Sequence, residues 1–432
     1  MFQENNPALT SWLDVPENND FPIQNLPFGI AKYEKGPLLS KRPGYQAVSI
    51  IGDNVIGLAV LHELDYFRDI QLPEGIFEKE YLNEFIDLGQ PVWRAVRKRL
   101  SELLRKDNHE LCNNKEALKR CLYNVHDVVL TLPVKIGDYT DFYSSREHAT
   151  NVGSMFRDPK NALMPNWLHL PVAYHGRASS IFVSGANFHR PKGQMLLPGT
   201  TDKPVFGETK ALDFELEMAF VIGKSTKPGE SVSTHDARKH IFGFTLFNDW
   251  SARDIQRWEY VPLGPFLGKN FASTMSPWIV TLDALEPFIT TAPKQEPDVL
   301  PYLRRPDSNG AFDINLEVWL QTTGKEETKI CMSNFKYMYW TIDQQLAHHT
   351  INGCNINIGD LMASGTISGP TPDSYGSMLE LTWNGSKPLI LPGGLQRKFL
   401  EDGDKVIIRG YSQKDGLRIG FGEAKAIVLP AV

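Results

Sequence analysis

Cysteine is scarce in this chain, with four residues in 432: Cys112, Cys121, Cys331 and Cys354. None belongs to a C-x-x-C pair, and none has the His-linked spacing of a zinc site, so the common zinc motifs are excluded. We therefore expect free thiols in a reducing compartment, which favours a cytoplasmic protein.

Long apolar runs are absent as well. No run approaches the roughly 18 residues that a membrane-spanning helix needs. The first twenty residues, MFQENNPALTSWLDVPENND, lack a basic region followed by an apolar stretch, so no secretory signal is visible. We expect neither membrane contact nor export.

Positive charge is limited, because the formal net charge is −6 and only RAVRKRLSELLRK concentrates Lys and Arg. A broad basic surface for nucleic acid is therefore excluded. A small-molecule substrate fits better.

Several catalytic motifs are missing too. GPFLGKN has the wrong spacing for a Walker phosphate loop, and VLHELDYF has His-Glu without a second His. SGTISGP lacks the G-x-S-x-G spacing of a nucleophile elbow, so Ser368 is interpreted as an ordinary loop serine. No G-x-G-x-x-G follows a predicted strand.

The elements that are present predict two domains, 1–133 and 134–432. In the first, YQAVSIIGDNVIGLAVL predicts a β-hairpin around Gly52-Asp53-Asn54. QPVWRAVRKRLSELLRK predicts an amphipathic helix with a solvated basic face, and a second helix is expected over 115–124.

The second domain is predicted to be β-rich with long functional loops. At least eight short apolar runs, among them ELEMAFVIG, FGFTLFND and KVIIRGY, are separated by Gly, Pro, Asn and Asp. Helices are expected only near 251–260 and 341–349.

The stretch DFELEM, residues 213–218, has the alternation of a half-buried strand, with Asp213, Glu215 and Glu217 on one face. Three like charges along one face repel each other. Two interpretations stay open: a solvated outer face, or a cation held between the carboxylates.

A second source of carboxylate follows an apolar strand in FGFTLFNDWSARDIQRWEYVP. Asp249 at its end could bind a metal or cap the next helix. That helix places Arg253, Gln256, Arg257 and Tyr260 on one face, which is typical of a surface that binds an anionic oxygen.

A third source, GDYTDFYSSREHATNVGSMFRDP (residues 137–159), predicts a turn-rich loop dense in titratable groups. His148 is its leading candidate for a general base. The other histidines that we considered are interpreted as structural: His169, His175, His348 and His349.

An all-oxygen ligand set favours calcium, magnesium or manganese. Such a metal suits a β-dicarbonyl or 2-oxo acid, whose oxygens it binds as a Lewis acid to stabilise an enolate.

At DYTDFYSSREHATNVGSMFR, PVAYHGRASS, DFELEMAFVIG, FNDWSARDIQRWEYVPLGPFLGKNF and ASGTISGP…GSMLEL, the chain closely resembles the fumarylacetoacetate hydrolase family. The resemblance implies an N-terminal SH3-like barrel, a C-terminal mixed β-sandwich roll and a homodimer. It also implies hydrolysis of the carbon–carbon bond of 4-fumarylacetoacetate to fumarate and acetoacetate, the last step of tyrosine and phenylalanine breakdown.

Carried over by position, the resemblance assigns roles to individual residues. Calcium ligands would be Asp141, Glu215, Glu217 and Asp249, and a magnesium site would involve Asp249, Lys269 and Ser273. Asp213 matches none of these ligands, so we expect it to be a strand-edge or solvated residue. His148 would be the general base, oriented by Glu380, and the oxyanion hole would consist of Arg253, Gln256 and Lys269. Substrate would contact Tyr143, Arg157, Tyr174, Gln256, Tyr260 and Thr366.

Two positions depart from the family pattern, because Ser273 stands where relatives have Thr and Glu147 where they have Gln. Serine keeps the hydroxyl. Glu147 flanks the base, and its negative charge would favour protonated His148 if the two side chains approach.

Two alternatives remain at this stage. One is another reaction on the same scaffold, such as decarboxylation of a 2-oxo acid, hydration or isomerisation. The other is a β-rich protein whose calcium is purely structural.

Overall fold

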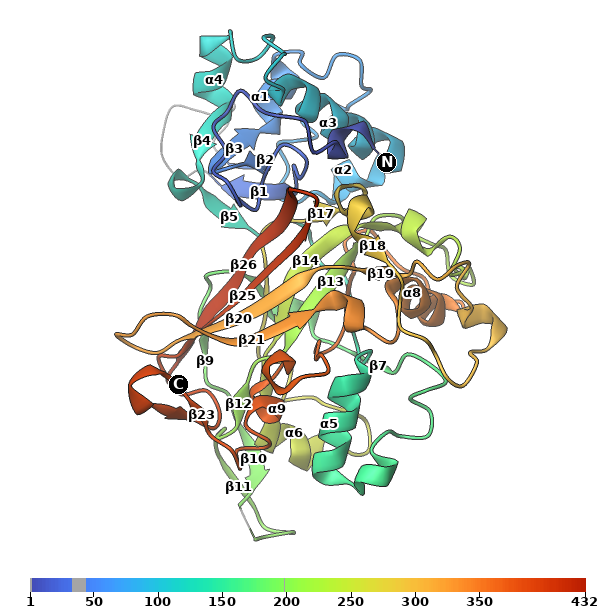
Figure 1. The fold of residues 1–432 in the computed structure, drawn as a ribbon, viewed down its shortest axis with the longest axis vertical. Coiled ribbons are helices and arrows are strands. Elements are labelled where there is room, and N and C mark those ends of the chain that lie inside the picture. The colour runs from blue at the N-terminus through green and yellow to red at the C-terminus, as the bar shows by residue number, and fades with distance from the viewer. Residues whose placement is uncertain (1, 33–43, 198) are drawn as a thin grey trace.

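The computed structural model describes residues 2–32, 44–197 and 199–432. Strands dominate and the helices are short, so the predicted mainly β class is confirmed. Figure 1 shows a small N-terminal part stacked on the end of a larger C-terminal part. In these described ranges, no helix is both long enough and apolar enough to cross a membrane.

A five-stranded antiparallel sheet forms the N-terminal part, in the order β4-β3-β2-β1-β5. Its strands are β1 Phe28–Lys32, β2 Tyr45–Ile51, β3 Asn54–Gly57, β4 Leu122–Asn124 and β5 Val129–Thr131. The predicted hairpin is present, since Ile51 pairs with Asn54 across Gly52 at φ +56°. The second run continues as a helix from Leu58, so the hairpin is shorter than predicted.

Within its described residues, this part has four α-helices that cover the sheet: α1 Leu58–Glu63, α2 Asn83–Asp87, α3 Gln90–Leu104 and α4 Lys115–Cys121. The predicted helix α3 is confirmed, and its expected apolar face is buried. Helix α4 ends earlier than predicted, because Leu122–Asn124 pairs with β3 as an edge strand.

The interpretation of the basic residues of α3 as a solvated face holds for Lys98, which is exposed, but is wrong for Arg97. Arg97 is buried and donates to the carbonyl oxygens of Gln24 and Asn25 and to the side chain of Asn5. Burial lowers the pKa of Arg97 to about 10. Arg94 forms a two-bond pair with Asp283, at 2.7 and 2.8 Å.

The larger part contains an eight-stranded sheet in which β7-β6-β22-β13-β14-β16-β8 are consecutive neighbours and β17 also pairs with β14. The strands are β6 Tyr139–Phe142, β7 Ala173–His175, β8 Ile181–Val183, β13 Leu216–Ile222, β14 Ile241–Asp249, β16 Ser273–Met275, β17 Val280–Thr281 and β22 Leu361–Ala363. Strand β22 lies between β6 and β13, so it joins segments that are far apart in the sequence.

A second sheet, β21-β20-β25-β26-β9, crosses the first (Figure 1). Its strands are β9 Phe188–His189, β20 Asn315–Gln321, β21 Thr328–Asn334, β25 Lys405–Lys414 and β26 Leu417–Leu429. Phe220 and Phe244 of the first sheet share one apolar core with Leu316, Ile408 and Phe421 of the second. This packing is the predicted sandwich.

Two-stranded ribbons and short helices complete the part. The ribbons pair β10 Lys192–Leu196 with β11 Pro204–Glu208, β12 Leu212–Asp213 with β15 Ser251–Ala252, β18 Ile289–Thr290 with β19 Ala311–Phe312, and β23 Leu389–Ile390 with β24 Gln396–Arg397. The helices are α5 Arg146–Phe156, α6 Arg253–Glu259, α7 Leu282–Leu285, α8 Ile342–Thr350 and α9 Met378–Leu381.

Helices α6 and α8 confirm two predictions, whereas the turn-rich loop predicted over 137–159 is wrong. That stretch contains β6 and the three-turn helix α5. Ser145 precedes the helix as its N-cap, and its side chain accepts from the backbone N–H of His148.

The two parts share a continuous apolar core. Trp93 of α3 packs edge-on against Phe242 of β14, with ring centroids 5.0 Å apart. Phe28 and Ile279 exchange two backbone hydrogen bonds, of 3.0 and 2.8 Å, across the junction. The N-terminal part therefore braces the sheet that carries the site described next.

Candidate active site

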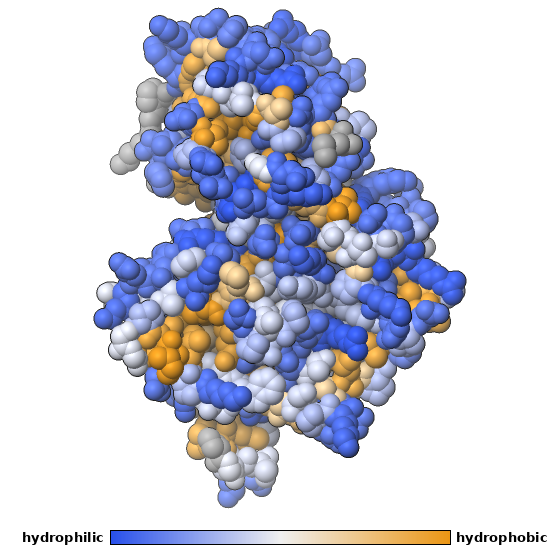
Figure 2. Space-filling view, in the orientation of Figure 1, coloured by the Kyte–Doolittle hydropathy of each residue, from blue (hydrophilic) through white to orange (hydrophobic). Residues whose placement is uncertain are grey.

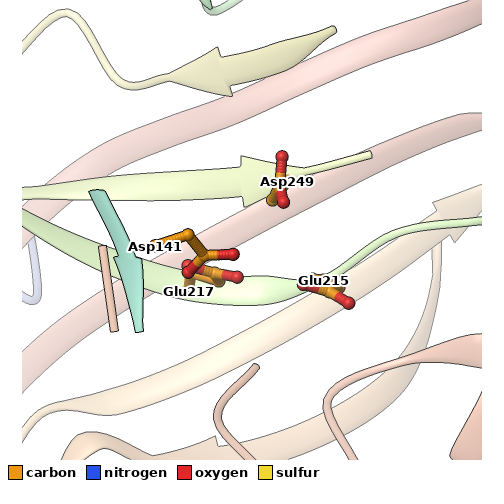
Figure 3. Close-up of side chains that lie close together, drawn as sticks. All are labelled: Asp141, Glu215, Glu217 and Asp249. Atoms are coloured by element: carbon orange, nitrogen blue, oxygen red, sulfur yellow. The ribbon is translucent and has the colours of Figure 1, made fainter. Parts of the chain in front are cut away.

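Four carboxylates converge at one end of the eight-stranded sheet (Figure 3). Asp141 lies on β6, Glu217 on β13, Asp249 at the end of β14 and Glu215 just before β13. One oxygen from each lies within 4.8 Å of the others, and all four side chains are buried. The register explains the convergence, because Asp141 and Ala219 both pair with Ala363 of β22, on opposite sides.

These residues fit a hard divalent cation. Burying several like charges together is costly unless a cation or donors compensate them. Among the described residues, Oδ1 of Asp141 and Oε1 of Glu217 are buried and accept no hydrogen bond. Burial and the neighbouring carboxylates raise the pKa of both groups. An ion with oxygen ligands would satisfy these acceptors.

The other two carboxylates are already partly neutralised. Lys269 Nζ lies 2.7 Å from Glu215 Oε2 and 2.7 Å from Asp249 Oδ2. Burial alone would raise the pKa of Glu215, but Lys269 and Arg253 hold it well below its ordinary value. Asp249 also accepts from Tyr174 Oη at 2.8 Å and from Ser273 Oγ at 2.9 Å.

A histidine–carboxylate pair lies close to this cluster. His148 Nδ1 is 2.7 Å from Glu380 Oε2, and both side chains are buried. An ionised Glu380 requires the Nδ1–H tautomer of neutral His148, which leaves Nε2 as the proton acceptor. The pair therefore has the geometry of a general base with its orienting carboxylate.

Glu380 is held by a shell of donors besides His148. It accepts from Asn151 Nδ2, Ser368 Oγ and Ser377 Oγ, each at 2.9 Å. Burial raises its pKa, but His148 and these donors more than offset that effect and lower it overall. Glu380 is consequently anionic at neutral pH.

Arg253, at the start of α6, contacts two carboxylates with two of its nitrogens. Its Nε donates to Asp213 Oδ2 at 2.8 Å, and its Nη1 is 2.7 Å from Glu215 Oε1. Gln256 lies one turn along, with its Oε1 3.4 Å from Nη1. Among the described residues, Nη2 is buried without an acceptor, so Arg253 keeps one donor available.

The structure brings most of the predicted site residues together. Tyr143 packs edge-on against His148, with ring centroids 5.2 Å apart, and Thr366 follows Gly365, whose N–H donates to Glu217 Oε2 at 3.1 Å. Two predicted residues lie at helix ends instead. Arg157 follows α5 and donates to the carbonyl oxygen of Ala162, while Tyr260 follows α6 and is half exposed.

Three sequence interpretations need correction. His148 lies on a helix and not on a loop. Asp249 does not cap α6, because its oxygens accept from Lys269, Ser273 and Tyr174. Asp213 is fully buried and hydrogen-bonded, whereas we had interpreted it as a solvated or strand-edge residue.

Glu147, which flanks the base, has a largely buried side chain. Its Oε2 has no hydrogen-bond partner among the described residues, and burial raises its pKa.

Sequence reasoning missed the shell around Glu380. Asn151 is one turn beyond His148 on α5, a spacing that would have revealed it had the helix been predicted. Ser368, dismissed as an ordinary loop serine, bonds both oxygens of Glu380. No local pattern marks Ser368, because its partner lies on a separate helix.

Two family profiles match the chain: "Fumarylacetoacetase N-terminal" over residues 24–133 and "Fumarylacetoacetate (FAA) hydrolase C-terminal" over residues 138–428. Curated relatives are similar over almost the full length. Fumarylacetoacetase of Homo sapiens is 53% identical over 423 residues, covering 98% of this chain and 99% of the relative. Those of Dictyostelium discoideum and Arabidopsis thaliana are 51% and 50% identical, each over 98% of this chain and over 98% and 99% of the relative.

Solved structures share the fold at low identity. A fumarylacetoacetate hydrolase of Exiguobacterium antarcticum superposes with a TM-score of 0.50 at 16% identity, covering 94% of this chain and 99% of that one. Cg1458 with inhibitor gives 0.51 at 15%, covering 94% and 100%.

Proposed function

Because the chain belongs to the fumarylacetoacetate hydrolase family and is a hydrolase, we propose that it cleaves a carbon–carbon bond of 4-fumarylacetoacetate to give fumarate and acetoacetate. The observation that carries this proposal is the meeting of a buried His148–Glu380 pair, two cationic donors and four carboxylates in one site. Hydrolysis of a 1,3-diketone needs a base for water, donors for an oxyanion and stabilisation of a carbanion.

The base is proposed to be Nε2 of His148. It takes a proton from water while the water oxygen adds to the ketone carbon beside the double bond. The bond from that carbon to the neighbouring methylene then breaks, and its electron pair leaves with acetoacetate as an enolate. The proton on His148 is then transferred to the former methylene carbon, which becomes the methyl group of acetoacetate, so the base is restored.

The oxyanion that forms on the attacked ketone is proposed to be held by Arg253, Lys269 and Gln256. The unpaired Nη2 of Arg253 supports this assignment, since it is buried and preoriented by the bonds of Nε and Nη1. Losing one donor of such a site costs about 10²–10³ in rate.

The metal ligands are proposed to be Asp141, Glu215, Glu217 and Asp249, with calcium as the ion. A bound cation would supply Lewis acidity toward the two carbonyl oxygens of a 1,3-diketone. For magnesium we propose the neighbourhood of Asp249, Lys269 and Ser273. Oxygen donors there are the Ser273 hydroxyl and the Asp249 carboxylate, because an ammonium group cannot ligate a cation.

Substrate recognition is assigned to the predicted polar residues around the pair and the cluster: Tyr143, Arg157, Tyr174, Gln256, Tyr260 and Thr366. The buried Thr366 hydroxyl supports this, since Oγ1 has no partner among the described residues. Arg157 and the tyrosines offer donors for terminal carboxylates.

Domain division at residues 133 and 134, a homodimer and a cytoplasmic location complete the proposal. The division is supported by the strand pairing, since β1–β5 pair only with one another in named sheets and β6 begins the larger sheet at Tyr139. The homodimer and the location stay predictions.

The test is turnover by purified, metal-loaded protein. We expect loss of the ultraviolet absorbance of the conjugated diketone, with equal amounts of fumarate and acetoacetate formed. His148→Ala should lower kcat about 10²–10⁴-fold and leave calcium binding by calorimetry unchanged.

His348→Ala is the control, because His348 is a partly buried histidine on α8 whose Nδ1 lies 3.0 Å from Tyr302 Oη and which has no proposed role in the site. It should keep kcat within about twofold. Intact substrate after incubation with wild type would refute the proposal, and rapid release of carbon dioxide from oxaloacetate would favour a decarboxylase instead.

A further inference from the structure

Asp213, the last residue of β12, is a buried carboxylate that the proposed chemistry does not use. Its side chain is fully enclosed, and both oxygens accept short hydrogen bonds. Oδ1 accepts from the backbone N–H of Met378 at 2.6 Å. Oδ2 accepts from the N–H of Leu379 at 3.0 Å and from Nε of Arg253 at 2.8 Å.

These donors belong to two different halves of the site. Met378 and Leu379 are the first residues of α9, the helix that carries Glu380. Arg253 begins α6 and directs Nη1 toward Glu215. One carboxylate therefore holds the helix of the His148–Glu380 pair and the guanidinium beside the metal ligands in a fixed mutual position.

We propose that Asp213 is a positioning residue that couples the general-base pair to the oxyanion donor. The proposal rests on the hydrolytic function proposed above. Asp213 acts through Glu380 on one side and through Arg253 on the other, and it touches neither substrate nor metal.

A role as a fifth metal ligand does not fit the geometry. Asp213 shares the nominal strand face of Glu215 and Glu217, but its two oxygens are occupied by N–H donors from α6 and α9. It is absent from the group of carboxylates whose oxygens converge. The ribbon pairing of Asp213 with Ser251 separates it from β13, which begins only at Leu216.

The anionic form of Asp213 is required because all three groups donate. An Asn side chain would present one N–H₂ group toward at least one N–H donor, and it would leave Arg253 balanced only by Glu215. Arg253 or α9 must then shift. A displacement of about 1 Å in a catalytic group costs on the order of 10² in rate.

The experiment compares Asp213→Asn with Asp404→Asn. Asp404 is a matched control far along the chain: it is equally buried, it bonds Nε and Nη2 of Arg397 at 2.8 and 3.0 Å, and it accepts the backbone N–H of Glu401 at 2.9 Å. Both variants therefore lose the same kinds of bond.

We expect Asp213→Asn to lower kcat about 10–100-fold with KM changed less than threefold. Asp404→Asn should keep kcat within about twofold at a comparable loss of thermal stability. In Arg253→Gln protein, the further effect of Asp213→Asn on kcat should be at least about threefold smaller than in wild type. The reason is that Asp213 can then act only through Glu380 and no longer through Arg253.

Hydrogen exchange supplies a readout independent of turnover. The amides of Met378 and Leu379 should lose protection in Asp213→Asn and keep it in Asp404→Asn. If wild type leaves the substrate intact, the proposed function fails and exchange still tests the contacts of Asp213.

The inference is overturned if folded Asp213→Asn protein keeps kcat within twofold of wild type, or if Asp404→Asn loses as much. Should Asp213→Asn not fold, Asp213→Glu moves the same charge by one methylene and should lower kcat about tenfold. Wild-type kcat in folded Asp213→Glu would equally overturn it.

Discussion

Glu380 accepts hydrogen bonds from four side chains at once, although it lies in the protein interior. Such a shell favours the charged form, and the pKa of Glu380 is lowered despite burial. In this arrangement the carboxylate can orient His148 without competing for its proton. The same shell links Glu380 to the pH dependence of stability.

The sign of that dependence follows from linkage. The folded protein binds fewer protons at Glu380 than the unfolded chain does, so the stabilisation is complete above the ordinary pKa, near 4.5, and is lost as pH falls through the folded-state value. Glu380→Gln should therefore flatten the fall of the urea midpoint below pH 5, because the variant has no carboxylate to protonate there. Parallel curves for the two proteins would contradict this.

Glu217 is a buried carboxylate that forms no ion pair with any residue that the structure describes. Without a cation, burial, Asp141 and Glu215 raise the pKa of Glu217, which signals destabilisation of its charged form. Glu217→Gln should raise the melting temperature of chelator-treated protein at pH 8 and lower that of calcium-loaded protein, because a ligand is lost.

Calorimetric scans with and without calcium test whether Glu217→Gln changes the melting temperature in opposite directions in the two states. Glu423→Gln is the control, since Glu423 is a partly buried carboxylate paired with Arg409 and Lys425. It should lower both melting temperatures alike. A Glu217→Gln variant with a lower melting temperature than wild type both with and without calcium would refute this prediction.

At the scale of elements, the loop after β22 depends on a glycine. Gly365 has φ +74°, and a Cβ there would lie 2.0 Å from the carbonyl oxygen of Phe142. Its N–H also binds Glu217. Gly365→Ala should therefore cost more than about 2 kcal/mol of unfolding free energy and weaken calcium binding.

Gly393→Ala provides the comparison, because Gly393 has φ +81° but nothing within 4 Å of the added Cβ. It should cost only the backbone strain, about 1–2 kcal/mol, and leave calcium affinity unchanged. Equal affinities in both variants would show that the close approach at Gly365 does not shape the metal site.

The strands of the two sheets were predictable because each is a short apolar run between turn residues. The helix α5 was not, since Thr150, Asn151 and Gly153 are poor helix formers. Its formation depends on the Ser145 cap and on close packing, because a Cβ on Gly153 would lie 2.0 Å from the carbonyl oxygen of Ala162. Tertiary contacts override propensity there.

The same limit applies to charged residues of the site. Glu215 and Glu217 were recognisable because their spacing and their chemistry agree. Asp213 and Arg97 were misinterpreted because their partners lie on other segments: Arg253 and α9 for Asp213, and Gln24, Asn25 and Asn5 for Arg97. Local periodicity contains no information about such partners.

At the scale of the whole molecule, the shared apolar core leads us to expect that the two parts unfold as one unit. The blue and orange surface of Figure 2 shows polar residues over most of the visible face, with apolar groups between them. The apolar side chains that join the parts are buried, with Trp93 on Phe242 and Phe28 beside Ile279.

Trp93→Ala should therefore cost about 3–5 kcal/mol of unfolding free energy and shift the whole molecule. We expect urea denaturation followed by far-ultraviolet circular dichroism and by loss of activity to give coincident midpoints, both lowered. Two separate transitions would show that the N-terminal part unfolds independently of the catalytic sheet.

The position of β22 in the sheet has a consequence for protein synthesis. Glu217 and Asp249 lie on the β13–β14 hairpin and Glu215 directly precedes it, and this hairpin can form as soon as residue 249 has left the ribosome. Asp141 is made earlier, yet its strand has no place beside theirs until residues 361–363 arrive to fill the gap. A nascent chain that meets a cation thus offers three of the four proposed ligands. We therefore expect metal binding to be one of the last events in the making of the protein, and truncated chains that end before β22 to be released without the ion.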